Sequence, residues 1–225
     1  TDGWIRLLYT HPAHYYPELI DVLAGEEALC PYLDVPLQHI SDGVLERMGR
    51  GIRRHEIEEL LDTLRERIPN LTLRTTFLVG FPGETDEDFQ ELLDFVGERR
   101  FERMGAFHYS KEEDTRAQKF KDQLPREARE ERYHALMQLQ RDIAFERAAE
   151  RVGEETVVLI EEEQTEGAEN RAIGRSPAEA PDVDPLVFVE DAHDLRRGQM
   201  VPVEIIDSFE YDCIARPIAK DTPEE

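Results

Sequence analysis

The first 150 residues alternate short apolar runs with longer segments whose apolar residues recur at helical spacing. Strand–helix repeats of this kind form parallel sheets with right-handed crossovers. The run after Arg74 is almost continuously apolar, which is typical of a parallel strand buried on both faces. Strands are predicted at Trp4–Tyr9, Tyr32–Leu37, Leu71–Val79 and Met104–Tyr109, and helices at 17–29, 41–48 with Ser41 as cap, 54–68, after the cap Thr85, and 126–151. Four strands do not close a barrel, so the sheet is either open or incomplete.

The pattern changes after Gly153 to short runs separated by Gly, Pro and Asp. Five strands are predicted, at 156–160, 170–175, 186–189, 200–206 and 211–215. Short strands at this spacing indicate a small all-β barrel. We therefore expect one α/β domain over residues 1–153, a barrel domain over 154–218 and a disordered tail over 219–225.

The two cysteines, Cys30 and Cys213, lie far apart and neither belongs to a Cys-x-x-Cys pair. No metal site is therefore expected within this sequence. No stretch approaches the roughly 20 apolar residues of a membrane span, and no leader opens the chain. The expected location is the cytoplasm. Because the chain starts at Thr1, we expect an N-terminus that has been processed or truncated.

The formal net charge is −24, from 27 basic and 51 acidic residues. Residues 155–218 hold 16 acidic and five basic side chains, more than double the density of negative charge in the preceding 154 residues. Such charge opposes direct nucleic-acid binding and favours a basic partner. Adaptation to a salty cytoplasm is an equally good explanation for the acidity of the whole chain.

In parallel α/β proteins, ligands bind at the carboxyl ends of the strands. Four segments follow the predicted strands and should converge there: 9–12, 36–39, 80–85 and 108–110. Gly80 and Gly83 allow a tight turn and a close approach of backbone to a ligand, and free N–H groups near Thr85 can meet an anion. The same residues also suit an ordinary strand–turn–helix connection.

Single side chains in these segments leave both structural and binding roles open. The amide of Gln38 can bracket a ribose or a carboxylate. His11, His39 and His108 can act in acid–base chemistry, but their spacing supports no metal site. Arg74 and Glu84 can either pair with each other or hold the two charged ends of a ligand.

These segments, in order, resemble the methylthiotransferases of the radical S-adenosylmethionine superfamily. The resemblance is carried by Trp4–Tyr9, Tyr32–Ser41, Val44–Arg50, Arg74–Thr85 and Tyr109–Glu112. The second domain resembles a TRAM domain, and Gly174–Ser176 with Ala180–Asp184 is similar to the RimO branch in particular. The implied fold is the C-terminal part of a (βα) TIM-type partial barrel followed by a five-stranded TRAM barrel.

The resemblance implies an enzyme that adds a methylthio group to the β-carbon of an aspartate in a basic protein of the small ribosomal subunit. It implies S-adenosylmethionine and two [4Fe–4S] clusters as cofactors, and such clusters need cysteine thiolates. The implied S-adenosylmethionine contacts are Gln38, Gly80, Phe81, Pro82 and Glu84, with Arg74, Thr76 and Tyr109 as further rim residues. No catalytic residue is assigned.

The sequence departs from the family pattern, because the cluster cysteines are absent and Asp114 and Pro185 stand where glycine is usual. Truncation explains the first departure, and the chain alone is expected to be inactive. Two alternatives stay open: a tRNA methylthiotransferase acting on a modified adenosine, and a non-catalytic ribosome-binding module. The acidic second domain favours a protein substrate over tRNA.

Overall fold

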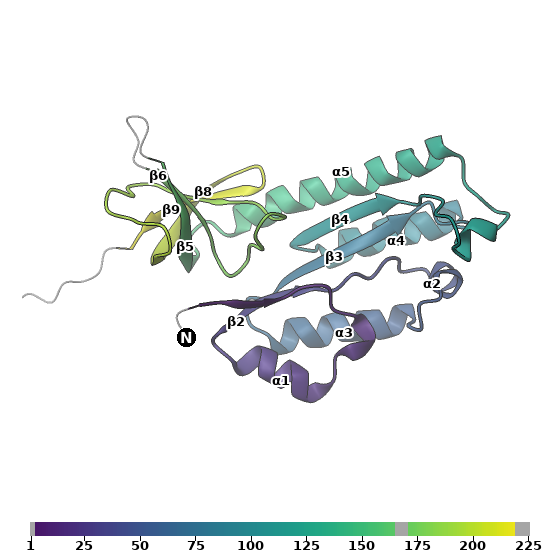
Figure 1. Ribbon diagram of the computed structural model, residues 1–225, viewed down its shortest axis with the longest axis horizontal. Coiled ribbons are helices and arrows are strands. Elements are labelled where there is room, and N and C mark those ends of the chain that lie inside the picture. The colour runs from purple at the N-terminus through teal and green to yellow at the C-terminus, as the bar shows by residue number, and fades with distance from the viewer. Residues whose placement is uncertain (1–2, 165–170, 219–225) are drawn as a thin grey trace, which may run out of the picture. The chain divides into compact units, whose positions relative to one another are not determined.

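The computed structural model describes residues 3–164 and 171–218 (Figure 1). The chain divides into two compact units, Thr1–Ile143 and Ala144–Glu225. The predicted tail at 219–225 lies outside the described residues. Within the described ranges, no helix is both long enough and apolar enough to span a membrane.

The first unit contains a four-stranded parallel sheet in the order β1-β2-β3-β4. Its strands are β1 Ile5–Leu7, β2 Leu29–Asp34, β3 Thr72–Val79 and β4 Arg103–His108. Its helices are α1 Pro17–Gly25, α2 Asp42–Met48, α3 Arg54–Arg67, α4 Asp86–Arg99 and α5 Arg126–Glu150, which continues into the second unit, and the 3-10 turns are η1 Pro12–His14 and η2 Ala117–Lys119. The described sheet is open at β1 and β4, and the predicted α/β class is confirmed.

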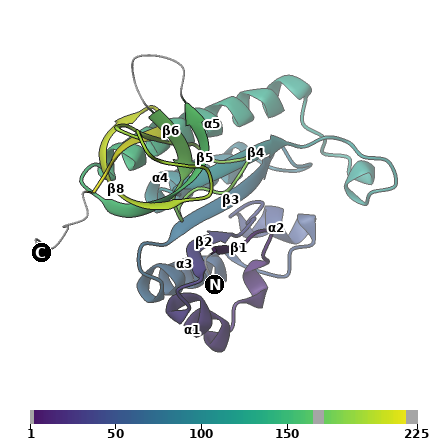
Figure 2. The same cartoon turned by 60° about the vertical axis from the view of Figure 1, so that its left-hand side comes forward.

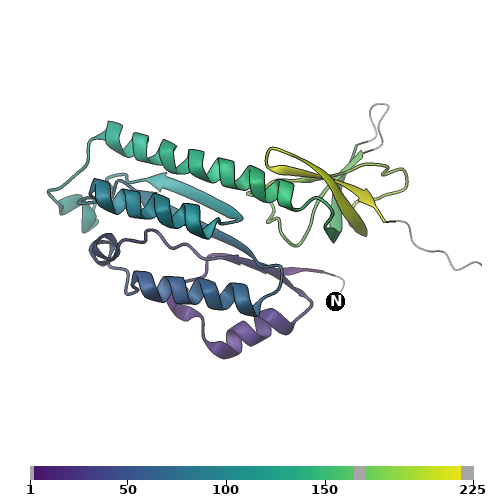
Figure 3. The same cartoon turned by 180° about the vertical axis from the view of Figure 1, so that it is seen from behind.

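Helices cover one face of this sheet (Figure 3). Along β3, Phe77 and Val79 are buried in the core that these helices form with the sheet. The alternating residues Arg74, Thr76 and Leu78 are half-buried on the opposite face. This alternation follows from the two-residue period of a strand, so the sheet has one helix-covered face and one open face.

The second strand differs from its prediction, because β2 begins at Leu29 and ends at Asp34 rather than at Leu37. Pro36 has no N–H to donate to a ladder, which interrupts regular pairing after Val35 donates to the carbonyl of Arg74. Pairing resumes for one residue only, at a bridge between Gln38 and Phe77.

Two helix starts show how local signals are used. Thr85 caps α4 as predicted, since its hydroxyl accepts from the Asp88 N–H at 3.1 Å. Ser41 precedes α2, but its hydroxyl does not cap that helix; it donates to the Asp88 carboxylate at 2.5 Å. Ser41 is therefore the N-cap residue of α2 by position, as predicted, but its hydroxyl is directed to Asp88 and accepts no N–H of the helix.

The second unit contains a closed barrel in the order β5-β6-β7-β9-β8 (Figure 2). Its strands are β5 Glu155–Gln164, β6 Arg171–Arg175, β7 Val187–Val189, β8 Met200–Phe209 and β9 Asp212–Pro217. Gly174 is needed for closure, since a Cβ there would lie 2.3 Å from the carbonyl oxygen of Leu159. The predicted five-stranded barrel is confirmed.

A buried ion pair fixes the loop between β6 and β7. Arg151 donates to Glu179 Oε1 at 2.5 Å, and Glu179 Oε2 accepts from the N–H and hydroxyl of Ser176 at 2.8 and 2.6 Å. Burial lowers the pKa of Arg151, but Glu179 and Glu154 more than offset this and raise it. Both oxygens of Glu179 are thus satisfied inside the barrel unit.

Candidate functional site

The carboxyl ends of the strands are joined by backbone hydrogen bonds. The Thr10 N–H donates to the Asp34 carbonyl at 3.0 Å, and the Gln38 N–H donates to the Thr76 carbonyl at 2.9 Å. The Tyr109 N–H donates to the Val79 carbonyl at 2.8 Å. We call the segments 9–11, 36–39, 80–84 and residue 109 the rim; the structure brings all four segments to one end of the sheet, as the sequence predicts.

Gln38 is held in a strained conformation at this rim. Its φ of 71° lies in the left-handed region, which is uncommon for a residue other than glycine. Its N–H and its carbonyl both pair with β3, through Thr76 and Leu78. The half-buried amide side chain makes no hydrogen bond with any described residue. Strained residues with free polar groups cluster at binding sites, so Gln38 remains a candidate ligand contact.

The turn at Gly80–Pro82 forms a packed wall of the rim. Gly80 has a φ of 70°, and a Cβ there would lie 2.4 Å from the side chain of Arg129. The ring of Phe81 packs edge-on against Tyr109 and Phe120, with centroid distances of 5.4 and 6.1 Å. The carbonyl of the buried Pro82 accepts from Arg47 Nε at 2.9 Å. These residues therefore shape the rim mainly through packing and backbone geometry.

Glu84 has a fully buried side chain that is already paired. Its Oε1 accepts from Arg132 at 2.6 Å, and its Oε2 accepts from the Phe81 N–H at 3.2 Å. His39 Nε2 lies 3.6 Å from the same Oε2. Because His39 Nδ1 accepts from the Ser41 N–H at 3.0 Å, the imidazole proton belongs on Nε2, facing the carboxylate.

Arg74 and Glu84 do not pair with each other. Arg74 donates instead to the buried carboxylate of Asp34 at 3.1 Å, on the open face of the sheet. Thr76 lies on this same face, two residues further along β3. The pairing possibility fails because strand periodicity turns Arg74 to the open face, whereas Glu84 binds Arg132 from α5.

Tyr109 contributes an unsatisfied polar atom. Its side chain is buried against Phe81, its carbonyl accepts from Arg129, and its hydroxyl has no partner among the described residues. A buried hydroxyl without a partner costs free energy that a bound ligand can recover. Gln38 and Tyr109 thus give the rim two polar groups that have no partner among the described residues.

Sequence reasoning missed the arginines that assemble this region. Arg129 and Arg132 come from α5, one turn apart, and hold the ends of β4 and β3. The sequence shows their positions in a predicted helix, but that helix is rich in charged residues, and nothing distinguishes these two arginines from the others. Asp114 gives the converse case, since its φ of 64° explains why glycine suits that position.

The described residues do not fit an iron–sulfur cluster. No group of three His, Cys, Asp or Glu side chains within residues 3–164 and 171–218 is placed to hold a metal. Cys30 in β2 and Cys213 in β9 are both buried and belong to different units. Such clusters need several thiolates together, and the described residues bring none together.

Comparison with known proteins decides the family. Residues 1–96 match the model of the radical SAM superfamily, and residues 152–218 match that of the TRAM domain. Residues 1–96 form a radical SAM domain, and residues 152–218 form a TRAM domain. A solved radical SAM enzyme, coproporphyrinogen III oxidase (HemN) from Escherichia coli, matches 67% of this chain and 34% of its own, with a TM-score of 0.50 and 20% identity. At that identity the likeness shows a shared radical SAM fold and nothing more.

Relatives of known name are similar along nearly all of this radical SAM chain. Proteins named "Ribosomal protein uS12 methylthiotransferase RimO" from Syntrophotalea carbinolica and Lachnoclostridium phytofermentans are 48% and 46% identical over 94% of the chain. A third, from Heliobacterium modesticaldum, is 46% identical over 96%. The chain spans about half the length of these relatives, 46 to 48%.

Proposed function

We propose that this chain acts within a radical SAM methylthiotransferase that adds a methylthio group to the β-carbon of an aspartate in ribosomal protein uS12. The observation that carries the proposal is the 46 to 48% identity to uS12 methylthiotransferases along nearly the whole chain, across both units. The cytoplasm, where ribosomal proteins are modified, is the expected location.

Within this proposal, the rim holds S-adenosylmethionine, which when bound supplies the radical that removes hydrogen from the substrate carbon. The side chain of Gln38 would hydrogen-bond the ribose, and the Gly80–Pro82 backbone with Tyr109 would line the adenine. Phe81, Phe120 and Tyr109 would exclude water from that side. Glu84, buried and paired, would position the turn, while Arg74 and Thr76 would border the open face.

The two [4Fe–4S] clusters that the family implies would be ligated outside this chain. The described residues lack a ligand set, and Cys30 and Cys213 are buried apart from each other in different units. This chain would therefore be inactive without a further segment that carries the ligands. An isolated chain that nonetheless methylthiolated uS12 would contradict this division of roles.

The acidic barrel unit would bind the basic substrate protein. Residues 155–218 carry 16 acidic and five basic side chains, and complementary charge steers association. The same charge repels the phosphates of RNA. We therefore propose a protein substrate and no direct nucleic-acid contact by this unit.

A competition assay tests the proposal. The full-length enzyme, reconstituted with its clusters, would be given uS12 and tRNA together with S-adenosylmethionine and a reductant. Mass spectrometry should find the methylthio group on an aspartate of uS12 and none on tRNA. Modification of tRNA alone would contradict the proposed substrate, and binding of uS12 without modification of either would favour a non-catalytic binding module.

A further inference from the structure

Arg50, which follows α2, is a half-buried cation without an acidic partner. One guanidinium nitrogen donates to the carbonyl of Pro36 at 2.9 Å, and the buried Nε has no partner. Among the described residues, no carboxylate lies within ion-pair distance of it. Burial lowers the pKa of Arg50 because the charged form is partly removed from water.

Two nearby arginines, by contrast, have acidic partners. Arg47 pairs with Asp122 at 3.2 Å, and Arg54 pairs with Glu58 and Glu91 at 2.8 and 2.6 Å. In a chain with 51 acidic and 27 basic residues, carboxylates are plentiful. Partly burying a cation without one is unfavourable, so a partner that the chain does not contain can account for its position.

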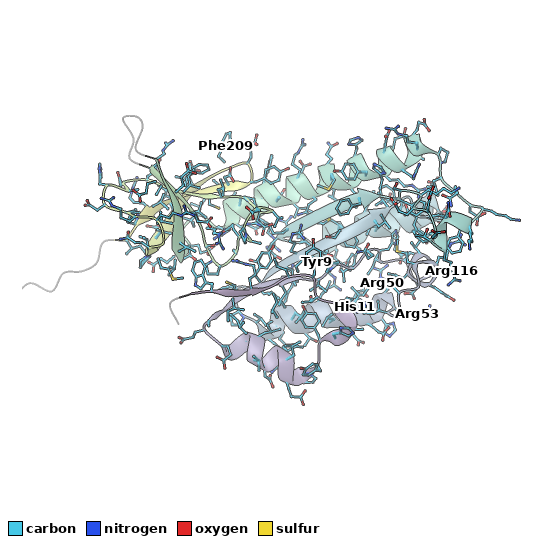
Figure 4. All side chains as sticks on the ribbon, viewed as in Figure 1. Tyr9, His11, Arg50, Arg53, Arg116 and Phe209 are labelled. Carbon is cyan, nitrogen blue, oxygen red and sulfur yellow. The ribbon has the colours of Figure 1, made fainter. Side chains whose placement is uncertain are left out.

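Arg50 lies close to the rim residue His11 (Figure 4). His11 accepts the Ala13 N–H on Nδ1 at 3.2 Å, so its remaining proton is on Nε2. Burial, the Arg50 cation and His14 lower the pKa of His11, which favours the neutral imidazole. Tyr9, with a φ of 57°, is 84% exposed at the same edge. Guanidinium N–H groups and an imidazole N–H are thus collected next to the rim.

We propose that Arg50, assisted by the Nε2–H of His11, binds the side-chain carboxylate of the aspartate that is modified. A guanidinium presents paired donors that match a carboxylate, and a charged hydrogen bond there distinguishes aspartate from asparagine. The β-carbon that is modified is bonded to that carboxylate, so binding the carboxylate would place the β-carbon at the rim. This inference rests on the proposed function and names its specificity determinant.

The same donors could bind the carboxylate of the methionine moiety of S-adenosylmethionine instead. A binding experiment distinguishes this carboxylate from that of the substrate aspartate. Full-length enzyme would be titrated calorimetrically with a peptide of the uS12 target loop, carrying either the target aspartate or asparagine. Each titration would be paired with one using S-adenosylmethionine. The variants are Arg50→Gln and Arg50→Lys, with Arg53→Gln as a control of equal charge, since exposed Arg53 already lies 3.9 Å from both Asp42 and Glu46.

The wild type should bind the aspartate peptide about 10- to 100-fold more tightly than the asparagine peptide. Arg50→Gln should abolish this preference, Arg50→Lys should restore part of it, and Arg53→Gln should keep it. Affinity for S-adenosylmethionine should stay within about twofold in every variant.

Two results would overturn the inference. An equal loss of affinity for both peptides would make Arg50 a support of the loop at Pro36 and no more. A loss of affinity for S-adenosylmethionine with peptide preference intact would assign the methionine carboxylate instead. Wild-type methylthiolation of uS12, measured separately, shows whether the proposed function itself holds.

Discussion

Each of the two units buries an arginine–glutamate pair. One arginine lies in α5, and the other directly follows that helix. Arg132 binds Glu84 in the turn after β3, whereas Arg151 binds Glu179 in the loop after β6. Both glutamates are almost fully buried. A buried pair of this kind is strongly destabilising to break, because it leaves an uncompensated charge.

The surroundings of the two pairs differ. Glu179 has both oxygens filled by Arg151 and Ser176, all within the barrel unit. Both oxygens of Glu84 are filled as well, by Arg132 and the Phe81 N–H, but at the rim His39 Nε2 and the Tyr109 hydroxyl have no hydrogen-bond partner among the described residues, and Gln38 has a φ of 71°. The comparison teaches that one pair closes a core whose polar groups are satisfied, while the other lies at a rim that keeps unpaired polar atoms and a strained residue, as the proposed ligand site requires.

The largest expected effect comes from removing the acidic charge of the pair in the barrel unit. Glu179→Gln should destabilise the barrel unit by about 3 kcal/mol, because Arg151 is left without its buried counter-charge. Hydrogen exchange of the barrel strands in denaturant would measure this. The matched variant Glu155→Gln, at an exposed residue, should leave exchange unchanged. Equal effects from the two variants would contradict the assigned role of Glu179.

The pair in the first unit should be less sensitive. Glu84→Gln should cost about 2 kcal/mol. Arg132 keeps Asp86 at 2.6 Å, as Arg151 keeps Glu154 at 2.7 Å, but among the described residues the Glu84 carboxylate accepts only one further hydrogen bond, from the Phe81 N–H, whereas Glu179 accepts two from Ser176. Urea unfolding followed by the fluorescence of Trp4 would measure it. An equal loss of unfolding free energy from Glu84→Gln and Glu179→Gln would contradict the proposed difference between the two pairs.

A smaller effect is expected at Asp88, which joins Ser41 to the start of α4. Burial raises the pKa of Asp88, but hydrogen bonds from Ser41 and Thr85 outweigh this and lower it. Asp88→Asn should cost about 1 kcal/mol at neutral pH. A lowered carboxyl pKa stabilises the fold above the ordinary value of 3.8, so the cost should shrink as pH falls below it. A cost independent of pH would argue against a charged Asp88.

The smallest effect concerns His11. Because its folded-state pKa is lowered, protonation opposes folding as pH falls below the ordinary value of 6.5. The wild type should therefore lose more stability between pH 7 and pH 5 than His11→Gln, as thermal melts at each pH would show. Parallel pH profiles would mean that His11 titrates normally and does not sense Arg50 or His14.

The sequence predicted which segments form strands and that the segments after them converge, because buried parallel strands and turn residues leave strong local signals, although β1 and β2 end earlier than predicted. Thr85, the Gly80 turn and the five barrel strands belong to this group. It failed where side chains choose partners across long separations. Glu84 joins Arg132, 48 residues away, and Arg74 joins Asp34, 40 residues away. Those choices depend on which face of a strand or helix meets which neighbour, and no local pattern encodes them.

The central claim is that the rim around Gln38 and the Gly80–Glu84 turn binds S-adenosylmethionine while the barrel unit does not. Hydrogen-exchange mass spectrometry of the reconstituted full-length enzyme tests it most directly. Adding S-adenosylmethionine alone should slow exchange of the backbone amides at 37–39 and 80–84 and leave those at 171–217 unchanged. Unchanged exchange at the rim, or protection confined to the barrel, would contradict the account.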